Sequence, residues 1–250
     1  MIVMKNVGLS YGPKEIFDTL NCSVGAGDFV VIIGPNGVGK TTLFDLVSGT
    51  VLPQTGSIFC HGRDVTNIDY AGRSDLVFRI FQNPSQNIVG EMTVRENLAL
   101  AMIRCKNVSL AHWTSVLEGV DEPALFAPMG GDVDGLLQTP MNRLSGGQRQ
   151  TIAFLLSTLF QPQILLLDEP TAALDPESAT RLLMLVKEKH AALRQTILFI
   201  THDLDIARYL GNKLWVIRDG KIVKEFVGQE KQNADLSPYL RSIDYKKLLD

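Results

Sequence analysis

The sequence of 250 residues is 45% hydrophobic and 20% charged, which is typical of a soluble globular chain able to bury a sizeable core. Its formal net charge of −3 supplies no general positive field, so bulk electrostatics do not indicate nucleic acid or an anionic membrane surface as a partner. Scattered cysteines without metal-ligand spacing, no signal-peptide layout and no apolar run near ~18 residues together predict a cytoplasmic protein that reaches a membrane only through a partner.

The predicted elements begin with two segments that alternate polar and apolar residues, IVMKNVGLSY and EIFDTLNCSV, as half-buried antiparallel strands do. FVVII at 29–33 is a continuous β-branched run typical of a buried parallel strand. ILLLD and TILFI, further along the chain, share this pattern, and each follows a helical stretch. KLWVIRDGKIVKEF predicts a hairpin that turns at Asp219-Gly220. The alternation of strands and helices predicts an α/β sheet.

Helical periodicity prevails between Phe81 and Leu144, with an interruption at DEPALFAPMGGD. We therefore predict an inserted α-helical subdomain over about 83–160. The last segment, 228–250, is a polar tail too short for a further regulatory domain.

The glycine-rich stretch GPNGVGKTT follows FVVII directly and precedes the helical LFDLV. It meets the pattern G-x-x-x-x-G-K-[ST] at Gly34, Gly39, Lys40 and Thr41, in the strand-to-helix setting that this pattern requires. Glycines let successive backbone N–H groups converge on phosphate oxygens, and the helix N-terminus adds its dipole. The stretch therefore predicts a nucleotide site, in which Lys40 reaches the β and γ phosphates and the Thr41 hydroxyl holds Mg²⁺, rather than a plain turn with a solvated lysine.

Two carboxylates, Asp168 and Glu169, end the strand ILLLD in the run ILLLDEP. In extended backbone their side chains would point to opposite sides, so we expect different roles for them. Asp168 is expected to orient the Mg²⁺ shell, and Glu169 to polarise a water for in-line attack on the γ-phosphate. The alternative, a pair of solvated acids at a strand end, loses weight once a phosphate loop precedes them.

A second glycine-rich stretch, LSGGQRQ at 144–150, precedes the apolar helical run TIAFLLSTLF. Ser145 is a suitable helix cap, and Gly146 and Gly147 leave backbone N–H groups unobstructed, so this helix end attracts an anion. In an ordinary capped core helix the two glycines would weaken the first turn without any packing benefit. This cost favours the anion-binding interpretation.

With a phosphate loop, LSGGQRQ and a DEP strand end in this order, the chain resembles an ATP-binding cassette (ABC) ATPase over nearly its whole length, and LSGGQRQ is similar to the signature motif of that family. The resemblance implies one ABC ATPase domain over 1–250. Its fold is α/β, with a P-loop NTPase core, an N-terminal antiparallel β-subdomain and an inserted α-helical subdomain that carries the signature motif. It also implies a dimer of two copies, in which the signature of one copy caps the ATP held by the phosphate loop of the other.

The resemblance further assigns site residues. The expected Mg²⁺ residues are Thr41, Gln82 and Asp168. The expected catalytic residues are Glu169, His202 and Gln82. The residues expected to contact ATP are Tyr11, Gly34, Asn36, Gly37, Gly39, Lys40, Thr41, Thr42, Ser145, Gly146, Gly147, Gln148 and Asp175.

Some of these assignments have ordinary structural alternatives. Tyr11 matches an aromatic residue that stacks on adenine, but a single aromatic residue in a strand is equally a core or surface residue. Asp175 matches a loop that crosses the dimer interface, and it is also a plain helix cap before Pro176. His202 matches the switch histidine that contacts the γ-phosphate, although a histidine at a strand end is more often a satisfied polar residue.

The resemblance implies the ATPase subunit of a transporter, most similar to bacterial importers of small organic solutes, with amino-acid uptake systems among them. Its implied partners are membrane permease subunits that dock near 83–97 and a substrate-binding protein, with no nucleic acid, and its implied place is the inner face of the cell membrane. The apolar residues Ile88, Val89, Met92 and Val94 predict a groove for a permease helix, unless they fold under the helical subdomain. The alternatives are a cassette for lipid or envelope export and a soluble cassette without a transport role.

Overall fold

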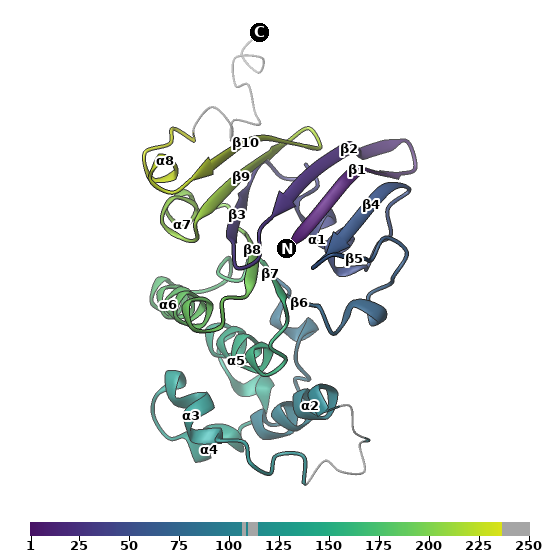
Figure 1. The fold of residues 1–250 in the computed structure, drawn as a ribbon. Coiled ribbons are helices and arrows are strands. Elements are labelled where there is room, and N and C mark those ends of the chain that lie inside the picture. The colour runs from purple at the N-terminus through teal and green to yellow at the C-terminus, as the bar shows by residue number, and fades with distance from the viewer. Residues whose placement is uncertain (107–108, 110–114, 237–250) are drawn as a thin grey trace.

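The computed structural model describes residues 1–106, 109 and 115–236 (Figure 1). Its strands are β1 Ile2–Tyr11, β2 Lys14–Val24, β3 Phe29–Ile33, β4 Thr55–Cys60, β5 Arg63–Asp64, β6 Val77–Ile80, β7 Ile164–Asp168, β8 Thr196–Ile200, β9 Lys213–Arg218 and β10 Lys221–Val227. Its α-helices are α1 Lys40–Ser48, α2 Val94–Lys106, α3 Glu122–Phe126, α4 Val133–Leu137, α5 Gly146–Leu159, α6 Pro176–Leu193, α7 Leu204–Tyr209 and α8 Gln229–Gln232. No helix of this described part combines the length and the apolarity that crossing a membrane requires.

The strands form two sheets. One is a four-stranded antiparallel sheet in the order β2-β1-β4-β5, and the other has six strands in the order β10-β9-β3-β8-β7-β6. In the second sheet β9, β3, β8, β7 and β6 pair in parallel, and β10 adds an antiparallel edge. The predicted α/β class, with its antiparallel β-subdomain and helical subdomain, is confirmed. The strands β4 and β5 were not predicted from the sequence.

Strand β3 joins the two layers of the core because its side chains alternate between the faces of the sheet. Phe29, Val31 and Ile33 pack with the helices α2, α5 and α6, whereas Val30 and Ile32 pack with α1 and the antiparallel sheet. All five side chains are buried, which explains why the sequence reads as a continuous apolar run. Figure 1 shows the antiparallel sheet and the helical subdomain at opposite ends of this layer.

A buried arginine fixes the C-terminal end of α1. The guanidinium of Arg73 donates to the carbonyl oxygens of Leu46 at 2.5 Å, Val47 at 2.9 Å, Val65 at 2.6 Å and Ile68 at 2.7 Å. The last carbonyl groups of a helix have no partner within it. The Arg73 cation therefore satisfies two carbonyl groups at the end of α1 and two in the segment before β6. Burial lowers the pKa of Arg73. The phosphate-loop helix is therefore anchored at the end opposite to its loop.

The helical subdomain differs from its prediction at one place. The segment DEPALFAPMGGD was predicted to interrupt the helices, but it forms α3 at Glu122–Phe126. Asp121 caps this helix by accepting from the N–H of Ala124 at 3.0 Å, and a proline lies in the first turn, where its missing N–H costs nothing. The proline and acidic residues that looked like breakers are thus helix-start signals.

The C-terminal hairpin is confirmed. Arg218 pairs with Lys221 across a two-residue turn, and Asp219 and Gly220 have φ values of 48° and 69°, as a type I′ turn requires. Beyond it the ammonium of Lys231 is buried against the C-terminal end of α7, where it donates to the carbonyls of Leu210 and Gly211. Of the predicted tail, residues 237–250 lie outside the described residues.

Candidate active site

The loop between β3 and α1 presents free backbone N–H groups. Gly39 is the N-cap of α1, with φ 103°, and no side chain caps this helix. A Cβ at Gly39 would lie 2.8 Å from Cζ of Phe17, so both its backbone angle and its packing require glycine. The first turn of α1 carries no acidic residue that would repel an anion. This helix end therefore suits a phosphate group.

Lys40 is held inside this loop. Its side chain is buried, and Nζ donates to the carbonyls of Gly34 at 2.8 Å and Pro35 at 2.9 Å. Burial lowers the pKa of Lys40, while the nearby charges of Glu169 and Asp168 raise it. The cation thus lies where the loop, α1 and the two carboxylates converge, as expected of a residue that binds phosphate. Thr41 and Thr42 follow it in the first turn of α1.

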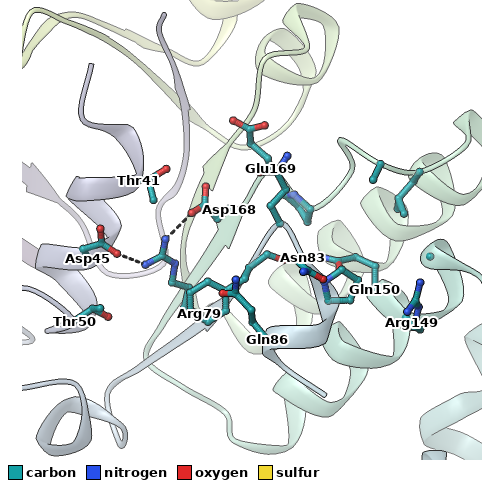
Figure 2. Close-up of a pocket in the computed structure, with 17 residues that line it drawn as sticks. Thr41, Asp45, Thr50, Arg79, Asn83, Gln86, Arg149, Gln150, Asp168 and Glu169 are labelled. Atoms are coloured by element: carbon teal, nitrogen blue, oxygen red, sulfur yellow. Dashed lines mark hydrogen bonds and ion pairs between the residues drawn. The ribbon is translucent and has the colours of Figure 1, made fainter. Parts of the chain in front are cut away.

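Asp168 ends β7 in a buried ion pair. Its Oδ2 lies 2.6 Å from a terminal nitrogen of Arg79, whose other terminal nitrogen lies 2.5 Å from Oδ1 of Asp45 (Figure 2). Burial raises the pKa of the Asp168 carboxyl, and the hydrogen bond and charge of Arg79 oppose this shift. The Arg79 guanidinium also lies over the ring of Phe81, 4.6 Å from its centroid. Asp168 is therefore held in one orientation.

Glu169 leaves the strand conformation. It has a φ of 47°, in the left-handed region, while its N–H still donates to the carbonyl of Ile200 at 3.1 Å. The extended backbone on which opposite side-chain directions would depend is therefore not present at Glu169. Its Oε1 lies 2.6 Å from Nε2 of His202, which follows β8, and its carboxylate points away from Arg79 (Figure 2). Strained backbone of this kind is common at functional sites.

Of these groups Asp45, Arg79, Asp168 and Glu169 line a cavity of about 710 Å³, and Lys40 and His202 are not among its lining residues. It extends from Thr41 and the two carboxylates to the loop after β6 and the start of α5. Gln82 lines it with an exposed side chain, two residues after β6 ends at Ile80. The structure thus brings Thr41, Asp168, Glu169 and Gln82 to one cavity, with His202 in contact with Glu169.

The N-terminal end of α5 has a complete capping box. Oγ of Ser145 accepts from the N–H of Gln148 at 3.2 Å, and Oε1 of Gln148 accepts from the N–H of Ser145 at 3.0 Å. The predicted cap at Ser145 is confirmed, and the role of Gln148 in it was not foreseen. Because the box uses the N–H of Gln148, the glycine amides before it remain for a ligand.

The two glycines of this stretch differ. A Cβ at Gly146 would meet nothing within 4 Å, but a Cβ at Gly147 would lie 2.7 Å from Cβ and Oγ of Ser178 in α6. The expectation that neither glycine brings a packing benefit is therefore wrong at Gly147, which lets α5 and α6 approach closely. That expectation holds only at Gly146, where an added Cβ would meet nothing within 4 Å.

A second cavity, of about 420 Å³, lies between these helix ends and is lined by Ser145, Gly147, Gln148 and Asp175 among others. Asp175 is the N-cap of α6, with Oδ1 accepting from the N–H of Ser178 at 2.9 Å. The second cavity shares no lining residue with the first. Of the predicted cap residues, Ser145, Gly147, Gln148 and Asp175 line the second cavity, whereas Gly146 lines the first.

The remaining predicted residues lie on the surface near the phosphate loop or in it. Tyr11 ends β1 with 48% of its surface exposed, so it is not a core residue. Asn36 and Gly37 are exposed in the loop, and Gly37 has a φ of 76°. An exposed ring is free to stack on a base.

Two oxygen donors of the first cavity suit Mg²⁺. The described residues contain no group of three or more His, Cys, Asp or Glu side chains that could hold a metal. Mg²⁺ commonly binds through one or two protein oxygens together with substrate phosphates, and the Thr41 hydroxyl and Asp168 carboxylate that line one cavity fit this pattern. These residues would hold the ion.

Arg79 and Asp45 were missed by sequence reasoning. Arg79 occupies an apolar strand, FRIFQ, in which a charged residue between apolar neighbours signals a buried ion pair. That signal shows that a partner exists without showing which acid it is.

Comparisons with known proteins agree with this geometry. The family model described as ABC transporter matches residues 17–172. A tyrosine transport ATP-binding protein of Clostridioides difficile (strain R20291) is 35% identical over 254 residues, which cover 98% of this chain and 99% of the relative. A methionine import ATP-binding protein of Brucella abortus (strain 2308) is 31% identical over 90% of this chain, which spans 59% of that relative.

Two solved structures are similar over almost the whole chain. A nucleotide-free ATP-binding cassette from an ABC transporter superposes with a TM-score of 0.78 at 28% identity, covering 95% of each chain. A dimeric ATP-binding cassette in a post-hydrolysis state, bound to ADP and Pi, superposes with a TM-score of 0.75 at 26% identity, covering 91% of this chain and 98% of the other.

Proposed function

Because this chain belongs to the ABC transporter family, as one of its ATP-binding ATPase subunits, we propose that it powers the import of a small organic solute through separate permease subunits. We propose further that hydrolysis takes place with Mg²⁺ between two copies of the chain, each a single cassette over 1–250 with a helical subdomain near 83–160. The observation that carries the transport part is an ordered loop that exposes apolar side chains beside Gln82.

In the proposed reaction the ATP phosphates bind at the N-terminus of α1 and at Lys40, whose ammonium neutralises phosphate charge. Thr41, Asp168 and Gln82 would hold Mg²⁺, which would supply electrostatic stabilisation of the charge that develops on the transferred phosphoryl group. Glu169 takes a proton from the attacking water, and His202 holds the Glu169 carboxylate in place through the 2.6 Å contact and faces the γ-phosphate.

The dimer is proposed to join the two cavities across its interface. The capped end of α5 offers the Gly146 and Gly147 amides to the ATP of the second copy, together with the exposed Ser145 and Gln148, while Asp175 lies at the boundary. Support comes from the second cavity, where Ser145, Gly147, Gln148 and Asp175 lie apart from Thr41 and the two carboxylates, and from the dimeric cassette that this chain resembles. Each site is then complete only when a second copy supplies its cap.

The docking surface is the loop 88–93. Ile88 and Val94 are 7% and 0% exposed and belong to the core, so the groove expected over four apolar residues is wrong for these two. Val89 and Met92 are 42% and 36% exposed. The apolar surface available to a partner therefore consists of Val89 and Met92.

This loop is ordered by Asn97, which is buried in α2. Asn97 donates to the carbonyls of Val89 at 3.0 Å and Met92 at 3.3 Å, and its Oδ1 accepts from the N–H of Val89 at 2.8 Å. The loop is thus rigid while two apolar side chains face outward. A preformed apolar surface of this kind favours a partner helix, because little ordering entropy is lost on binding.

The solute class rests on the relatives. One relative that matches over its full length is a tyrosine transport protein and another relative is a methionine import protein, so we propose a solute of amino-acid type, delivered by a substrate-binding protein. The chain would then lie in the cytoplasm against the inner face of the membrane, held there by its permease. ATP-driven closure of the dimer would move the docked permease helix.

The test is co-purification of the chain with its membrane subunits from detergent extracts, followed by ATP-driven uptake of labelled amino acids in vesicles. Val89→Glu with Met92→Glu is expected to abolish both co-purification and uptake while the affinity for ATP stays within about 2-fold, since the nucleotide residues are untouched. Val223→Glu is the matched control, because Val223 is 45% exposed on β10.

Normal assembly of the Val89/Met92 variant would contradict the docking surface. Failure of the unaltered chain to recruit any membrane subunit would favour a soluble cassette. Outward transport of lipid would favour an export complex.

A further inference from the structure

We infer that Arg79 is a positioning residue for hydrolysis, which holds the Asp168 carboxylate in the orientation that Mg²⁺ coordination requires. The inference rests on the proposed function, since it assumes that Asp168 serves the metal. Arg79 itself is not expected to contact ATP.

The geometry is that of a bridge. Arg79 projects from β6 and is 3% exposed, and its two terminal nitrogens bind different carboxylates, Oδ2 of Asp168 at 2.6 Å and Oδ1 of Asp45 at 2.5 Å. Asp45 lies in α1, four residues after Thr41. One guanidinium therefore ties the helix that carries Thr41 to the strand end that carries Asp168 (Figure 2).

Two aromatic rings also contact the Arg79 guanidinium. The guanidinium lies 4.6 Å from the Phe81 centroid and 5.7 Å from the Phe44 centroid. The carbonyl of Arg79 accepts from Asn87 at 2.7 Å, which anchors its backbone to the loop after β6. The ring contacts and two-point binding together leave the guanidinium one orientation, because its planar fork donates in fixed directions and a lysine ammonium does not.

The consequence concerns the two oxygens of Asp168. Arg79 engages Oδ2, which leaves Oδ1 outside the ion pair and available to the cavity that Thr41 also lines. Partners that orient a metal ligand commonly set the metal affinity of a site. A carboxylate without this partner would rotate, and it would stay buried without its counter-charge.

The experiment measures the affinity of a fluorescent ATP analogue in EDTA and across a Mg²⁺ titration. For Arg79→Met we expect affinity in EDTA within about 2-fold of the unaltered chain, and a Mg²⁺ concentration for half-maximal tightening that rises about 10-fold or more, the order found for losing a metal ligand's partner. Arg79→Lys keeps the charge but loses the simultaneous contact with Asp45 and Asp168. We expect it to raise the required Mg²⁺ concentration less than Arg79→Met does. A residue with a merely structural role would weaken both measurements together.

Arg104→Met is the matched control. Arg104 also lies over aromatic rings, 5.6 Å from the Phe78 centroid and 5.2 Å from the Phe160 centroid, without contacting Asp168. We expect no change in its Mg²⁺ dependence. Asp45→Asn keeps an oxygen acceptor for Arg79 and is expected to shift the Mg²⁺ dependence less than Arg79→Met.

Asp168→Asn separates the two levels of the proposal. The double variant combines Arg79→Met with Asp168→Asn. If Arg79 acts through Asp168, its Mg²⁺ concentration for half-maximal tightening will be no higher than that of Asp168→Asn alone. An additive double variant, or an unchanged Mg²⁺ dependence in both Arg79 variants, would overturn the positioning role. An unchanged Mg²⁺ dependence in Asp168→Asn would instead overturn the assignment of Asp168 to the metal.

Discussion

The Nε2 of His202 and the Oε1 of Glu169 lie 2.6 Å apart, across the ends of β8 and β7. Within this pair the histidine is the more exposed side chain, at 43% against 19%. The contact joins a group suited to accept a proton from water with a group suited to orient it. Variants at the two residues can therefore show which of them accepts the proton and which one orients the other.

The first prediction concerns Glu169. Glu169→Gln keeps the shape and a hydrogen bond to His202 but removes the basic carboxylate, so turnover should fall ~10²-fold or more while ATP still binds. Lys40→Ala should weaken ATP binding itself. Steady-state hydrolysis measures the turnover rate, and nucleotide titration measures the affinity for ATP. The control is His61→Gln, at an exposed histidine outside the cavity, which should change neither quantity. Near-normal hydrolysis by Glu169→Gln would move the base to His202.

The second prediction uses two adjacent glycines. Gly147→Ala places a methyl group 2.7 Å from Ser178, so overpacking should lower the free energy of unfolding by about 1–3 kcal/mol. Gly146→Ala meets nothing within 4 Å and should leave stability unchanged or raise it by up to about 1 kcal/mol. Thermal unfolding of the two variants checks this, and equal melting temperatures would contradict the close approach of α5 and α6.

The third prediction concerns Arg73. Arg73→Met removes the donor of the carbonyl groups of Leu46, Val47 and Ile68 and one of the two donors of the Val65 carbonyl, so the free energy of unfolding should fall by about 3 kcal/mol or more. Arg63→Met is the control, because its ion pair with Asp75 spans 3.5 Å between exposed side chains and should contribute at most about 1 kcal/mol. Urea unfolding compares the two, and similar losses would remove the special role of Arg73.

The fourth prediction concerns pH and Lys231. Burial lowers the pKa of Lys231 from 10.5 to about 8. Between these values the unfolded chain binds more protons than the folded chain, so the contribution of Lys231 to the free energy of unfolding rises with pH. Urea unfolding at about pH 7 and about pH 9.5 should show the unaltered chain gaining stability relative to Lys231→Met. Parallel pH profiles would show that this lysine titrates normally.

The parts of the fold that the sequence predicted have local signals. The run Phe29–Ile33 is apolar on both faces because both faces are buried, and Asp219-Gly220 has the chemistry of its turn. The strand Thr55–Cys60 was missed because TGSIFC is short and its place depends on pairing with Ile2–Tyr11, far away in the sequence. The helix Glu122–Phe126 was missed because its starting signals also occur in turns.

The candidate site also has residues that local motifs predict and residues whose partners lie far away in the sequence. Lys40 and Asp168 belong to contiguous motifs, whereas Arg79 pairs with acids 34 and 89 positions away, and no local pattern records such a pairing. The packing role of Gly147 was hidden for the same reason, because it depends on Ser178 in another helix. Sequence motifs thus predicted the groups that we propose to meet the nucleotide, and the structure added the groups that hold them.

The two cavities of one chain share no lining residue, and this has a genetic consequence. In the proposed head-to-tail dimer, a copy defective at Lys40 and a copy defective at Ser145 would together form one intact site and one doubly damaged site. Two alleles that are each inactive alone would then partly rescue each other when expressed in the same cell. Two alleles both defective at Lys40, or both defective at Ser145, would not.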